Sequence, residues 1–239
     1  MNREEFIDEL EKLGISLSGY DLIAFNQYCE FLKEYNSHTN LTAIKDDDQI
    51  FLKHFYDSLT IVKAVDLNKY NSLLDIGTGA GFPGMVLKIV YPHLKLTLLD
   101  SNNKKITFLK QLAEKLKLKN IEFVNDRAEE YCQKHREEFD IVTARAVTNM
   151  TVLSELCLPL TRLDGYFIAM KGSNTEEIKE AEYAIKVLGG NIEETINFNL
   201  PIEEDGRNIV KIKKEKNTPK EYPRRYDKMV KKPLKNNGK

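Results

Sequence analysis

Residues 73–84 read Leu73-Leu74-Asp75-Ile76-Gly77-Thr78-Gly79-Ala80-Gly81-Phe82-Pro83-Gly84. The apolar run at the start of this stretch is typical of a buried strand, and the glycines predict a tight loop that leads into a helix. A strand that ends in such a loop directs backbone N–H groups and the positive end of a helix dipole to one point. Because four glycines in eight residues exceed what a turn requires, we interpret the stretch as a ligand-binding loop.

From residue 72 onward, segments typical of strands alternate with segments typical of helices. The expected strands are 72–76, 95–99, 121–124, 139–144, 165–171, 191–198 and 207–214. The expected helices are 84–90, 102–117, 127–135, 149–158 and 174–188. This alternation predicts an α/β fold with a doubly wound, mainly parallel sheet of seven strands. Since no helix separates the last two strands, we expect them to pair as an antiparallel hairpin.

The region before the first strand has the apolar spacing of helices only. We expect two helices within residues 2–35, a polar loop at 36–40 and a further helix at 48–65. Ser18 is the expected N-cap of the second helix, and Asp21 completes a capping box. The chain then has three expected parts: an N-terminal helical cap (1–70), a Rossmann-like domain (71–214) and a basic, irregular C-terminal tail (215–239).

Composition limits the class of protein. Hydrophobic residues make up 41% of the 239 residues and charged residues 31%, which is typical of a soluble globular protein. No apolar run approaches the roughly 20 residues that span a bilayer, and the N-terminus lacks the features of a signal peptide. The three cysteines form no CxxC pair, which argues against disulfides and a zinc site. We expect a cytoplasmic monomer that holds no metal and contacts no membrane.

Charge is distributed unevenly along the chain. Residues 211–239 carry 12 Lys or Arg and three Asp or Glu, whereas the other 210 residues carry 24 and 34. A basic block of this kind predicts contact with a polyanion, although a solvated tail is the plainer alternative. Interleaved tyrosine and arginine side chains favour nucleic acid, because both stack on unpaired bases. The expected phosphate contacts are Lys216, Lys220, Arg224, Arg225 and the lysines beyond them.

Charged residues follow the expected strands, at the edge where doubly wound sheets bind ligands. Asp75 ends the first strand and Asp100 follows the second; a carboxylate at Asp100 can accept both hydrogen bonds of a ribose diol. Residues 125–129 follow the third strand, and Arg145 follows the fourth. Each has a structural alternative: Asp100 as a helix N-cap, the acids of 125–129 as first-turn charges, and Arg145 in a salt bridge.

A nicotinamide dinucleotide and S-adenosylmethionine both need a glycine loop and a ribose acid. The spacing Gly79-x-Gly81-x-x-Gly84, with Asp100 about 20 residues on, formally matches the dinucleotide pattern. Asp75 favours S-adenosylmethionine, because an acid there would face the cationic amino acid part of that cofactor instead of a pyrophosphate. The classes of protein that remain as alternatives to an RNA methyltransferase are an NAD-dependent oxidoreductase, a small-molecule methyltransferase and a non-catalytic RNA-binding protein.

Motifs from both ends and the middle of the chain match one family. They are Asn40-Leu41-Thr42, Lys53-His54-Phe55-Tyr56-Asp57-Ser58-Leu59, Asp75 through Gly84, Asp126-Arg127-Ala128-Glu129, Thr143-Ala144-Arg145-Ala146, Lys216-Asn217-Thr218-Pro219 and Tyr222-Pro223-Arg224. On these residues the chain resembles the RsmG (GidB) family, the bacterial small-subunit (16S) ribosomal RNA guanine-N7 methyltransferases. The sequence departs from the family's usual tail at Glu221 and at Tyr226-Asp227-Lys228.

The resemblance implies a class I (Rossmann-like) methyltransferase with a helical cap. It also implies S-adenosylmethionine as the cofactor and small-subunit ribosomal RNA or the 30S subunit as the partner. By motif position, it implies cofactor contacts at Gly77, Phe82, Ala128, Glu129 and Arg145. Together with the strand-end analysis, the expected cofactor-binding residues are Asp75, Gly77, Gly79, Gly81, Phe82, Asp100, Ala128, Glu129 and Arg145.

Guanine N7 has a free lone pair and can attack a methyl group without losing a proton, so no general base is expected. Arg145 is the expected catalytic residue, through positioning of the guanine or of a phosphate. His54 and Asp57 are spaced one helical turn apart. They form either a structural hydrogen-bonded pair or part of the substrate side of the site.

Overall fold

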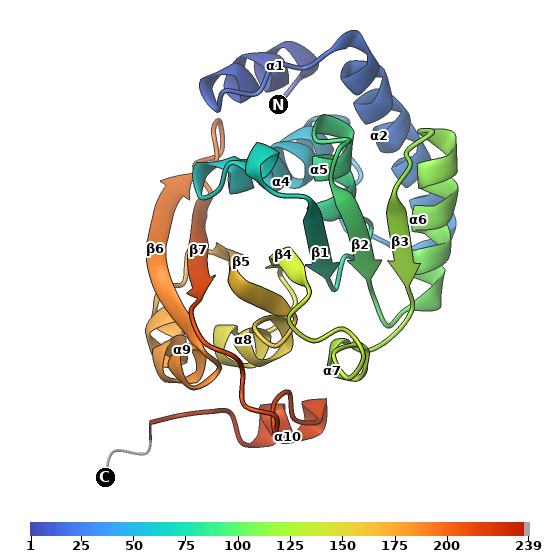
Figure 1. Cartoon of the computed structure of the whole chain (residues 1–239). Helices are drawn as coiled ribbons and strands as arrows, with labels where there is room; N and C mark the ends of the chain where they lie inside the picture. The colour runs from blue at the N-terminus through green and yellow to red at the C-terminus, as the bar shows by residue number, and fades with distance from the viewer. Residues whose placement is uncertain (237–239) are drawn as a thin grey trace.

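The computed structural model of the chain describes residues 1–236, so Lys239 of the expected basic tail lies outside the described residues. Its centre is a seven-stranded sheet in the order β3-β2-β1-β4-β5-β7-β6 (Figure 1). The strands are β1 (Ser72–Ile76), β2 (Lys95–Leu99), β3 (Ile121–Val124), β4 (Phe139–Arg145), β5 (Thr161–Gly172), β6 (Gly190–Asn199) and β7 (Gly206–Lys214). β7 runs antiparallel to both of its neighbours and the other pairs are parallel. The expected mainly parallel α/β sheet with a terminal hairpin is confirmed.

Successive residues of the central strands point to opposite faces of the sheet and build two apolar cores. Leu73 of β1 and Ile141 of β4 pack in one cluster, which also contains the N-terminal helices. Their neighbours Leu74 and Val142 pack in a second cluster. A strand that is covered on both faces needs apolar residues at consecutive positions, which explains the apolar runs in β1 and β4.

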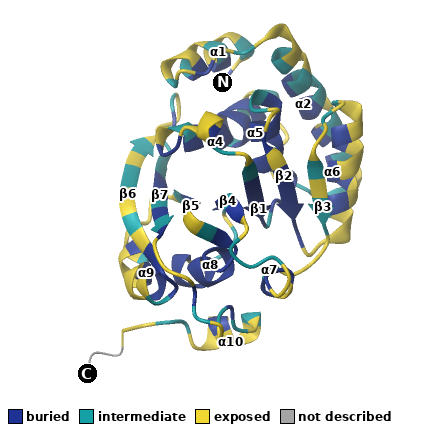
Figure 2. Cartoon of the chain, in the orientation of Figure 1, coloured by how far each residue is buried: buried dark blue, intermediate teal, exposed yellow. Residues whose placement is uncertain are grey.

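Helices cover both faces of the sheet, and Figure 2 shows their buried sides turned toward the strands. The first face carries α1 (Arg3–Lys12), α2 (Gly19–Thr39), α5 (Gly84–Val90) and α6 (Asn103–Lys115). The second face carries α7 (Ala128–Tyr131), α8 (Met150–Cys157) and α9 (Glu176–Val187). All of the expected helices of the Rossmann-like domain are therefore present, with ends that differ by a few residues.

The prediction of a loop at 36–40 is wrong for residues 36–39, which are helical. α2 begins at the expected capping box of Ser18 and continues through Thr39. Asn36 is buried in its last turns, where its amide donates to the Thr42 carbonyl at 2.8 Å and its oxygen accepts from the Thr42 N–H at 3.0 Å. Because the chain after the helix satisfies this polar side chain, the helix can continue through a polar stretch.

The expected helix at 48–65 is present but its winding changes along its length. It consists of α3 (Asp47–Ile50), the π-helical turn η1 (Phe51–Tyr56), α4 (Asp57–Leu59) and the 3₁₀ turn η2 (Thr60–Lys63). A separate 3₁₀ turn, η3 (Leu67–Lys69), precedes β1. Single π-helical turns inside α-helices are frequent at functional sites. This π turn carries His54.

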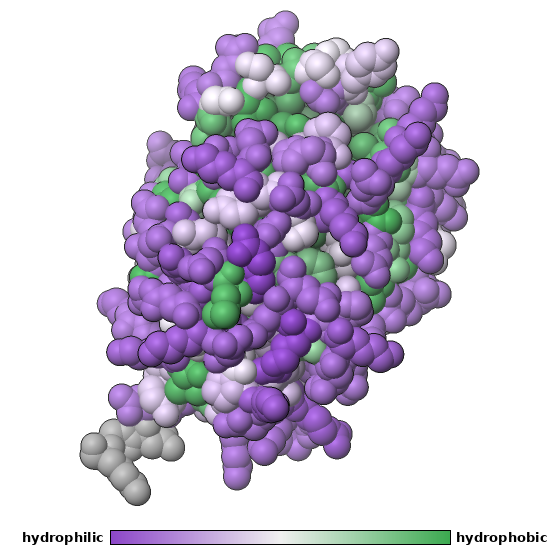
Figure 3. All heavy atoms as spheres, in the orientation of Figure 1, coloured by the Kyte–Doolittle hydropathy of each residue, from purple (hydrophilic) through white to green (hydrophobic). Residues whose placement is uncertain are grey.

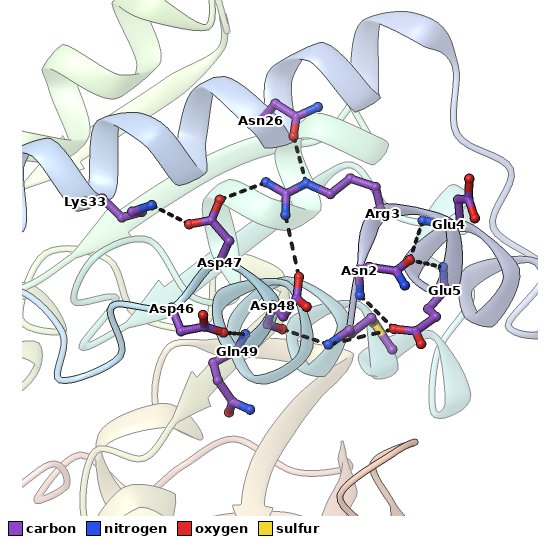
Figure 4. A network of polar contacts seen from close by, with 11 residues as sticks. Asn2, Arg3, Glu4, Glu5, Asn26, Lys33, Asp46, Asp47, Asp48 and Gln49 are labelled. Carbon is purple, nitrogen blue, oxygen red and sulfur yellow. Dashed lines mark hydrogen bonds and ion pairs between the residues drawn. The ribbon is translucent and has the colours of Figure 1, made fainter.

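Ion pairs join the first helices to one another (Figure 4). Arg3 of α1 donates to Asn26 of α2 at 3.1 Å and to Asp47 of α3 at 3.1 Å. Asp47 also pairs with Lys33 of α2. Each of these partly exposed pairs contributes little to stability by itself. Together they fix the positions of three helices relative to one another.

The N-terminal helices also contact the glycine loop, residues 77–84. Tyr28 of α2 is fully buried, and its hydroxyl donates to the Ala80 carbonyl at 2.5 Å. Its ring stacks on Phe82 with centroids 5.5 Å apart. A single apolar cluster runs from Phe6 to Ile209. The expected cap and the Rossmann-like domain therefore share one core.

The C-terminal tail, expected to be irregular, contains a short helix, α10 (Tyr226–Lys231). Figure 1 shows α10 beside the layer of α7 and α8. Met229 of α10 is fully buried in the second apolar cluster. The sequence does not predict α10, because a six-residue helix with one buried apolar residue among lysines is too short to show a helical apolar pattern.

None of the helices in residues 1–236 is long and apolar enough to cross a bilayer. In the view of Figure 3, hydrophilic residues cover most of the surface and apolar residues form smaller patches between them. Two of the exposed large apolar side chains, Tyr20 and Ile23, lie on α2. The others come from separate parts of the chain: Leu163, Tyr183, Ile202 and Val230.

Replacing Tyr28 with phenylalanine should lower the free energy of unfolding by about 1–3 kcal/mol, because the buried Ala80 carbonyl loses its donor. Urea denaturation measures this change. Tyr20→Phe on the same helix is the matched control, since Tyr20 is 86% exposed and its hydroxyl remains solvated. Equal unfolding midpoints for the two variants would contradict a structural role for the hydroxyl of Tyr28.

Candidate active site

The loop between β1 and α5 has a backbone conformation that favours glycine. Gly77, Gly79 and Gly81 have φ values of 66°, 61° and 100°, which lie in the left-handed region. A Cβ at Gly77 would lie 2.7 Å from Val147, and one at Gly81 would lie 2.5 Å from the Tyr28 hydroxyl. At Gly79 the nearest atom would be 3.9 Å away, so the space in front of Gly79 is open to a ligand.

Asp75, at the end of β1, is fully buried beneath this loop. Its Oδ2 accepts hydrogen bonds from the Thr78 hydroxyl at 2.6 Å and from the Gly84 N–H at 2.9 Å. Its Oδ1 has no partner among residues 1–236. Burial raises the pKa of Asp75 to about 7, against the lowering effect of these hydrogen bonds and of Arg145. Asp75 thus holds the loop with one oxygen, while its other oxygen is buried without a partner among the described residues.

Asp100, after β2, holds the loop from its other side. Its Oδ2 accepts from the Gly79 N–H at 3.0 Å and its Oδ1 accepts from the Asn102 N–H at 2.9 Å. The N-cap of α6 is Asn102, so the alternative that Asp100 is the N-cap is wrong. Pro83 is the N-cap of α5, the helix that follows the loop.

A cavity of about 270 Å³, here called the glycine-loop cavity, lies beside these residues. Its lining joins Gly77 and Asp100 to Ala128 and Glu129 of α7. Glu129 is buried, and Arg127 lies 3.6 Å from its carboxylate. The other lining residues are Ile76, Leu99, Ser101, Asp126, Arg127, Val147, Leu156 and Tyr226. Aliphatic walls with carboxylates among them fit a nucleoside, which has a flat apolar base and a polar ribose.

Arg145, at the end of β4, lies in a largely buried charged cluster. Its Nη1 donates to Oδ2 of Asp57 at 3.0 Å and to the Lys53 carbonyl at 2.8 Å. Its guanidinium lies over the Phe82 ring, 5.2 Å from the centroid. Arg207 of β7 pairs with the other oxygen of Asp57 at 3.2 Å. The salt bridge considered for Arg145 is therefore present, but two arginines share one aspartate and a net positive charge remains.

His54 joins this cluster as a neutral side chain. Its Nδ1 lies 3.2 Å from Nη2 of Arg145, and its Nε2 lies 2.8 Å from Oγ1 of Thr42. Because arginine only donates, we assign Nδ1 as the acceptor and place the proton on Nε2. Burial, aided by the charge of Arg145, lowers the pKa of His54 to about 3. Among the described residues, the side chains of His54 and Asp57 both bind Arg145 and form no hydrogen bond with each other.

A second cavity, of about 430 Å³ and here called the arginine cleft, opens beside the cluster. Its lining includes His54, Asp57, Arg145, Lys171 and Arg207. Small-molecule sites typically have volumes of about 300–1,000 Å³. Arg145 and Ala146 line the arginine cleft, whereas the next residue, Val147, lines the glycine-loop cavity. The two cavities therefore both border the short segment that follows β4.

The four expected phosphate contacts differ in their surroundings. Lys216, Lys220 and Arg225 are exposed. Arg224 instead donates to both oxygens of Glu155 in α8, from Nε at 2.7 Å and from Nη2 at 2.6 Å, and Glu155 is buried. Because the chain's own carboxylate occupies its guanidinium, the structure does not place Arg224 as a free phosphate ligand.

Two residues of the cavities, Arg207 and Tyr226, were not expected from the sequence. Arg207 is 150 positions away from its partner Asp57, and only the pairing of β7 with β5 brings it to the cluster. Tyr226 belongs to a helix that was not expected. The signals that could have found them are weak: an arginine at the start of a buried strand, and a tyrosine in a stretch of lysines.

Comparison with known proteins identifies the family. A family model described as rRNA small subunit methyltransferase G (GidB) matches residues 21–209. The chain belongs to this family. Proteins named ribosomal RNA small subunit methyltransferase G from Bacillus licheniformis, Bacillus subtilis and Listeria monocytogenes are 52%, 50% and 50% identical to it over 228 residues. These matches cover 94% of this chain and 95–96% of theirs. The resemblance found from the motifs is confirmed.

Solved structures share the fold at low sequence identity. The YcgJ protein of Bacillus subtilis matches with a TM-score of 0.53 and 13% identity, over 68% of this chain and 100% of its own. A SAM-dependent methyltransferase from Aquifex aeolicus matches with a TM-score of 0.52 and 18% identity, over 73% of this chain and 97% of its own. These likenesses agree with the expected class I (Rossmann-like) fold.

Replacing His54 with glutamine should make stability less sensitive to acid. A histidine whose pKa falls from about 6.5 unfolded to about 3 folded stabilises the protein above pH 6.5, and this contribution is lost as the pH falls toward 3. The free energy of unfolding of the unchanged protein should therefore fall more steeply between pH 6 and 4, by about 1 kcal/mol per pH unit. Urea denaturation at several pH values measures both slopes. His38→Gln, at an exposed position, controls for the chemical change, and parallel slopes for His54→Gln and the unchanged protein would contradict a neutral His54.

Proposed function

We propose that the chain transfers a methyl group from S-adenosylmethionine to N7 of a guanine in small-subunit (16S) ribosomal RNA. Membership of the rRNA small subunit methyltransferase G family supports the reaction and the RNA. The observation in the structure that carries the proposal is the placement of the two cavities. A cavity with aliphatic walls and carboxylates and a cationic cleft border the same segment, residues 145–147. A cofactor in the first and a base in the second would therefore be neighbours.

The residues of the glycine loop fit this cofactor. The open space at Gly79 is one that a Cβ would fill, and the unpartnered buried oxygen of Asp75 suits an amino group directly or through water. Asp100 and Glu129 offer carboxylates to the ribose and adenine sides of the glycine-loop cavity. When bound, S-adenosylmethionine supplies a methyl group on a positively charged sulfur. We propose the complete set of cofactor contacts as Asp75, Gly77, Gly79, Gly81, Phe82, Asp100, Ala128, Glu129 and Arg145.

The chemistry at N7 needs positioning and no proton transfer. The N7 lone pair forms the new bond to carbon as the carbon–sulfur bond breaks, and the positive charge passes from sulfur to the purine ring. His54 is unsuited to act as a base, because both of its ring nitrogens are engaged and its pKa is about 3. Orientation of the two reactants can supply about 7–11 kcal/mol of barrier lowering. We assign this positioning to Arg145, which the contacts from Asp57 and Lys53 hold in place.

The target guanine must be unpaired or turned out of its helix. N7 lies in the major groove, which in A-form RNA is too deep and narrow for side chains to enter. The arginine cleft offers its positive charge to the phosphates beside such a base. Further phosphates are expected at Lys216, Lys220 and Arg225, which are exposed on the C-terminal segment.

The setting of the reaction follows from its substrate. An enzyme of ribosomal RNA acts where ribosomes assemble, so we propose a cytoplasmic protein that works on the RNA or on the 30S subunit. We also propose a monomer, because only Tyr20 and Ile23 of the exposed large apolar side chains in residues 1–236 share an element. Family membership disfavours the NAD-dependent oxidoreductase and the small-molecule methyltransferase. The buried carboxyl of Asp75 beneath the loop is also a poor neighbour for a pyrophosphate.

A methyl-transfer assay tests the proposal. Labelled S-adenosylmethionine is incubated with the protein and with small-subunit RNA, or 30S subunits, from cells that lack the gene, and the nucleosides are analysed by mass spectrometry. The expected product is 7-methylguanosine at one site. Transfer to another atom would contradict the N7 proposal, and no transfer to either substrate despite cofactor binding would contradict ribosomal RNA as the acceptor.

The inactive reference for this assay is Gly79→Asp, which should abolish cofactor binding in calorimetry because its side chain fills the open space of the loop. Gly14→Asp is the matched control. Gly14 also has a positive φ, of 76°, and a Cβ placed there would have no atom within 4 Å, so it carries the same backbone cost away from the site. Binding by Gly79→Asp equal to that of Gly14→Asp would remove the loop from the cofactor site.

Neutralising Lys216, Lys220 and Arg225 to glutamine should weaken RNA binding and flatten its salt dependence. Each lost phosphate contact lowers the slope of log K against log salt concentration by about 0.7–0.9. Filter binding across a range of salt concentrations measures the slope. Lys12, Lys69 and Lys95 are exposed on α1 and at the amino ends of the strands, and their triple glutamine variant should keep the original slope.

The fourth basic residue, Arg224, should behave differently from the other three. Arg224→Gln leaves the buried carboxylate of Glu155 without its partner, which should lower the free energy of unfolding by on the order of 3 kcal/mol. A stable Arg224→Gln protein with a reduced salt slope would instead return Arg224 to the phosphate contacts.

A further inference from the structure

The C-terminal segment, residues 215–236, brings a tyrosine to the wall of the glycine-loop cavity. Tyr226 is the first residue of α10, and it lines this cavity together with Leu156 of α8 and Ala128 of α7. Figure 1 shows α10 beside α7 and α8, on the far side of them from α1. The lining of the glycine-loop cavity therefore includes a residue about 150 positions after Gly77 in the chain.

Hydrogen bonds from the body of the protein fix the start of this segment. Arg136 donates from Nη2 to the carbonyls of Thr218 and Pro219, at 2.6 and 2.9 Å, and from Nη1 to the carbonyl of Tyr222 at 2.6 Å. Glu137 accepts from the Thr218 N–H at 2.7 Å. Because these bonds hold the backbone itself, the path of the segment does not depend on exposed side chains.

A buried ion pair fixes the residues immediately before Tyr226. The carboxylate of Glu155 accepts from the backbone N–H of Arg224 at 2.9 Å as well as from its guanidinium. Glu155 is 1% exposed. Glu155 directly precedes Leu156, which lines the cavity, so the ion pair holds the segment next to the cavity wall. On the other side of Tyr226, the buried Met229 holds α10 to the second apolar cluster.

The chemistry of the cavity suits an adenine ring beside Tyr226. Leu99, Val147 and Leu156 supply apolar walls, and the tyrosine ring is partly buried among them. Aromatic side chains bind nucleobases by stacking, which needs no particular hydrogen-bond pattern. The carboxylates of Asp100 and Glu129 then remain for the polar parts of the nucleoside.

We propose that Tyr226 is a cofactor-binding residue, whose ring contacts the adenosine part of S-adenosylmethionine. This inference rests on the cofactor of the proposed function. It assigns a second role to the C-terminal segment, whose exposed residues Lys220, Arg225 and Lys228 face solvent. The segment has a cofactor contact on its inner side and the expected RNA charges on its outer side.

Calorimetry with S-adenosylhomocysteine and with 5′-methylthioadenosine tests the contact. Tyr226→Ala should bind both about tenfold more weakly than the unchanged protein, because both ligands carry the adenosine part. Tyr226→Phe should bind within about twofold of the unchanged protein, since it keeps the ring. Tyr183→Ala, on α9 and outside the lining of this cavity, is the matched control and should bind normally.

A spectroscopic readout separates contact from folding. In protein labelled with 3-fluorotyrosine, the ¹⁹F signal that is missing in Tyr226→Phe identifies Tyr226. That signal should shift when S-adenosylhomocysteine saturates the unchanged protein. Normal binding by Tyr226→Ala, or an unmoved Tyr226 signal, would overturn this proposal alone. Failure of the unchanged protein to bind either ligand would overturn the cofactor of the proposed function as well, whereas binding without RNA methylation would leave Tyr226 standing.

Discussion

The backbone of the loop between β1 and α5 is the constraint on which the rest of the structure depends. Its positive φ angles need glycine, and its N–H and C=O groups need partners that the loop cannot provide itself. Asp75 accepts a hydrogen bond from the Gly84 N–H, and Asp100 accepts one from the Gly79 N–H. The Tyr28 hydroxyl donates to the Ala80 carbonyl. Two strands and a distant N-terminal helix thus hold one loop, and this explains why the helical cap is packed into the core of the sheet domain.

The charged cluster beside the loop differs from the loop, because its charged side chains are largely buried and their desolvation costs free energy. One aspartate serves two arginines, and the histidine between Thr42 and Arg145 stays neutral. The excess charge is therefore positive and lies at the arginine cleft. An arrangement with engaged ring nitrogens and fixed guanidinium groups suits the holding of an anionic substrate. It suits general acid–base chemistry poorly, in agreement with a reaction that releases no proton from the base.

The periodic parts of the fold could be predicted from the sequence, and the long-range pairs could not. Strand and helix alternation, the terminal hairpin and the glycine loop depend on local patterns, and all of them are present. The π-helical turn around His54 and the extension of α2 through Asn36 depend on contacts with other segments. Arg224 looked like a phosphate ligand because its partner, Glu155, is 69 positions away. For the site, strand ends indicated Asp75, Asp100 and Arg145, whereas Arg207 and Tyr226 needed the folded chain.

The shared core has a consequence for how the chain folds during synthesis. Phe6 and Leu10 of α1 belong to the same apolar cluster as Ile168 of β5 and Ile209 of β7. The helices made first pack on one another, as Phe6 does on Phe25 and Phe51, but the sheet that they cover is complete only when β7 enters between β5 and β6. For most of translation the nascent chain carries unprotected apolar surface, which invites aggregation or chaperone binding. The chain reaches its stable state late, as one unit.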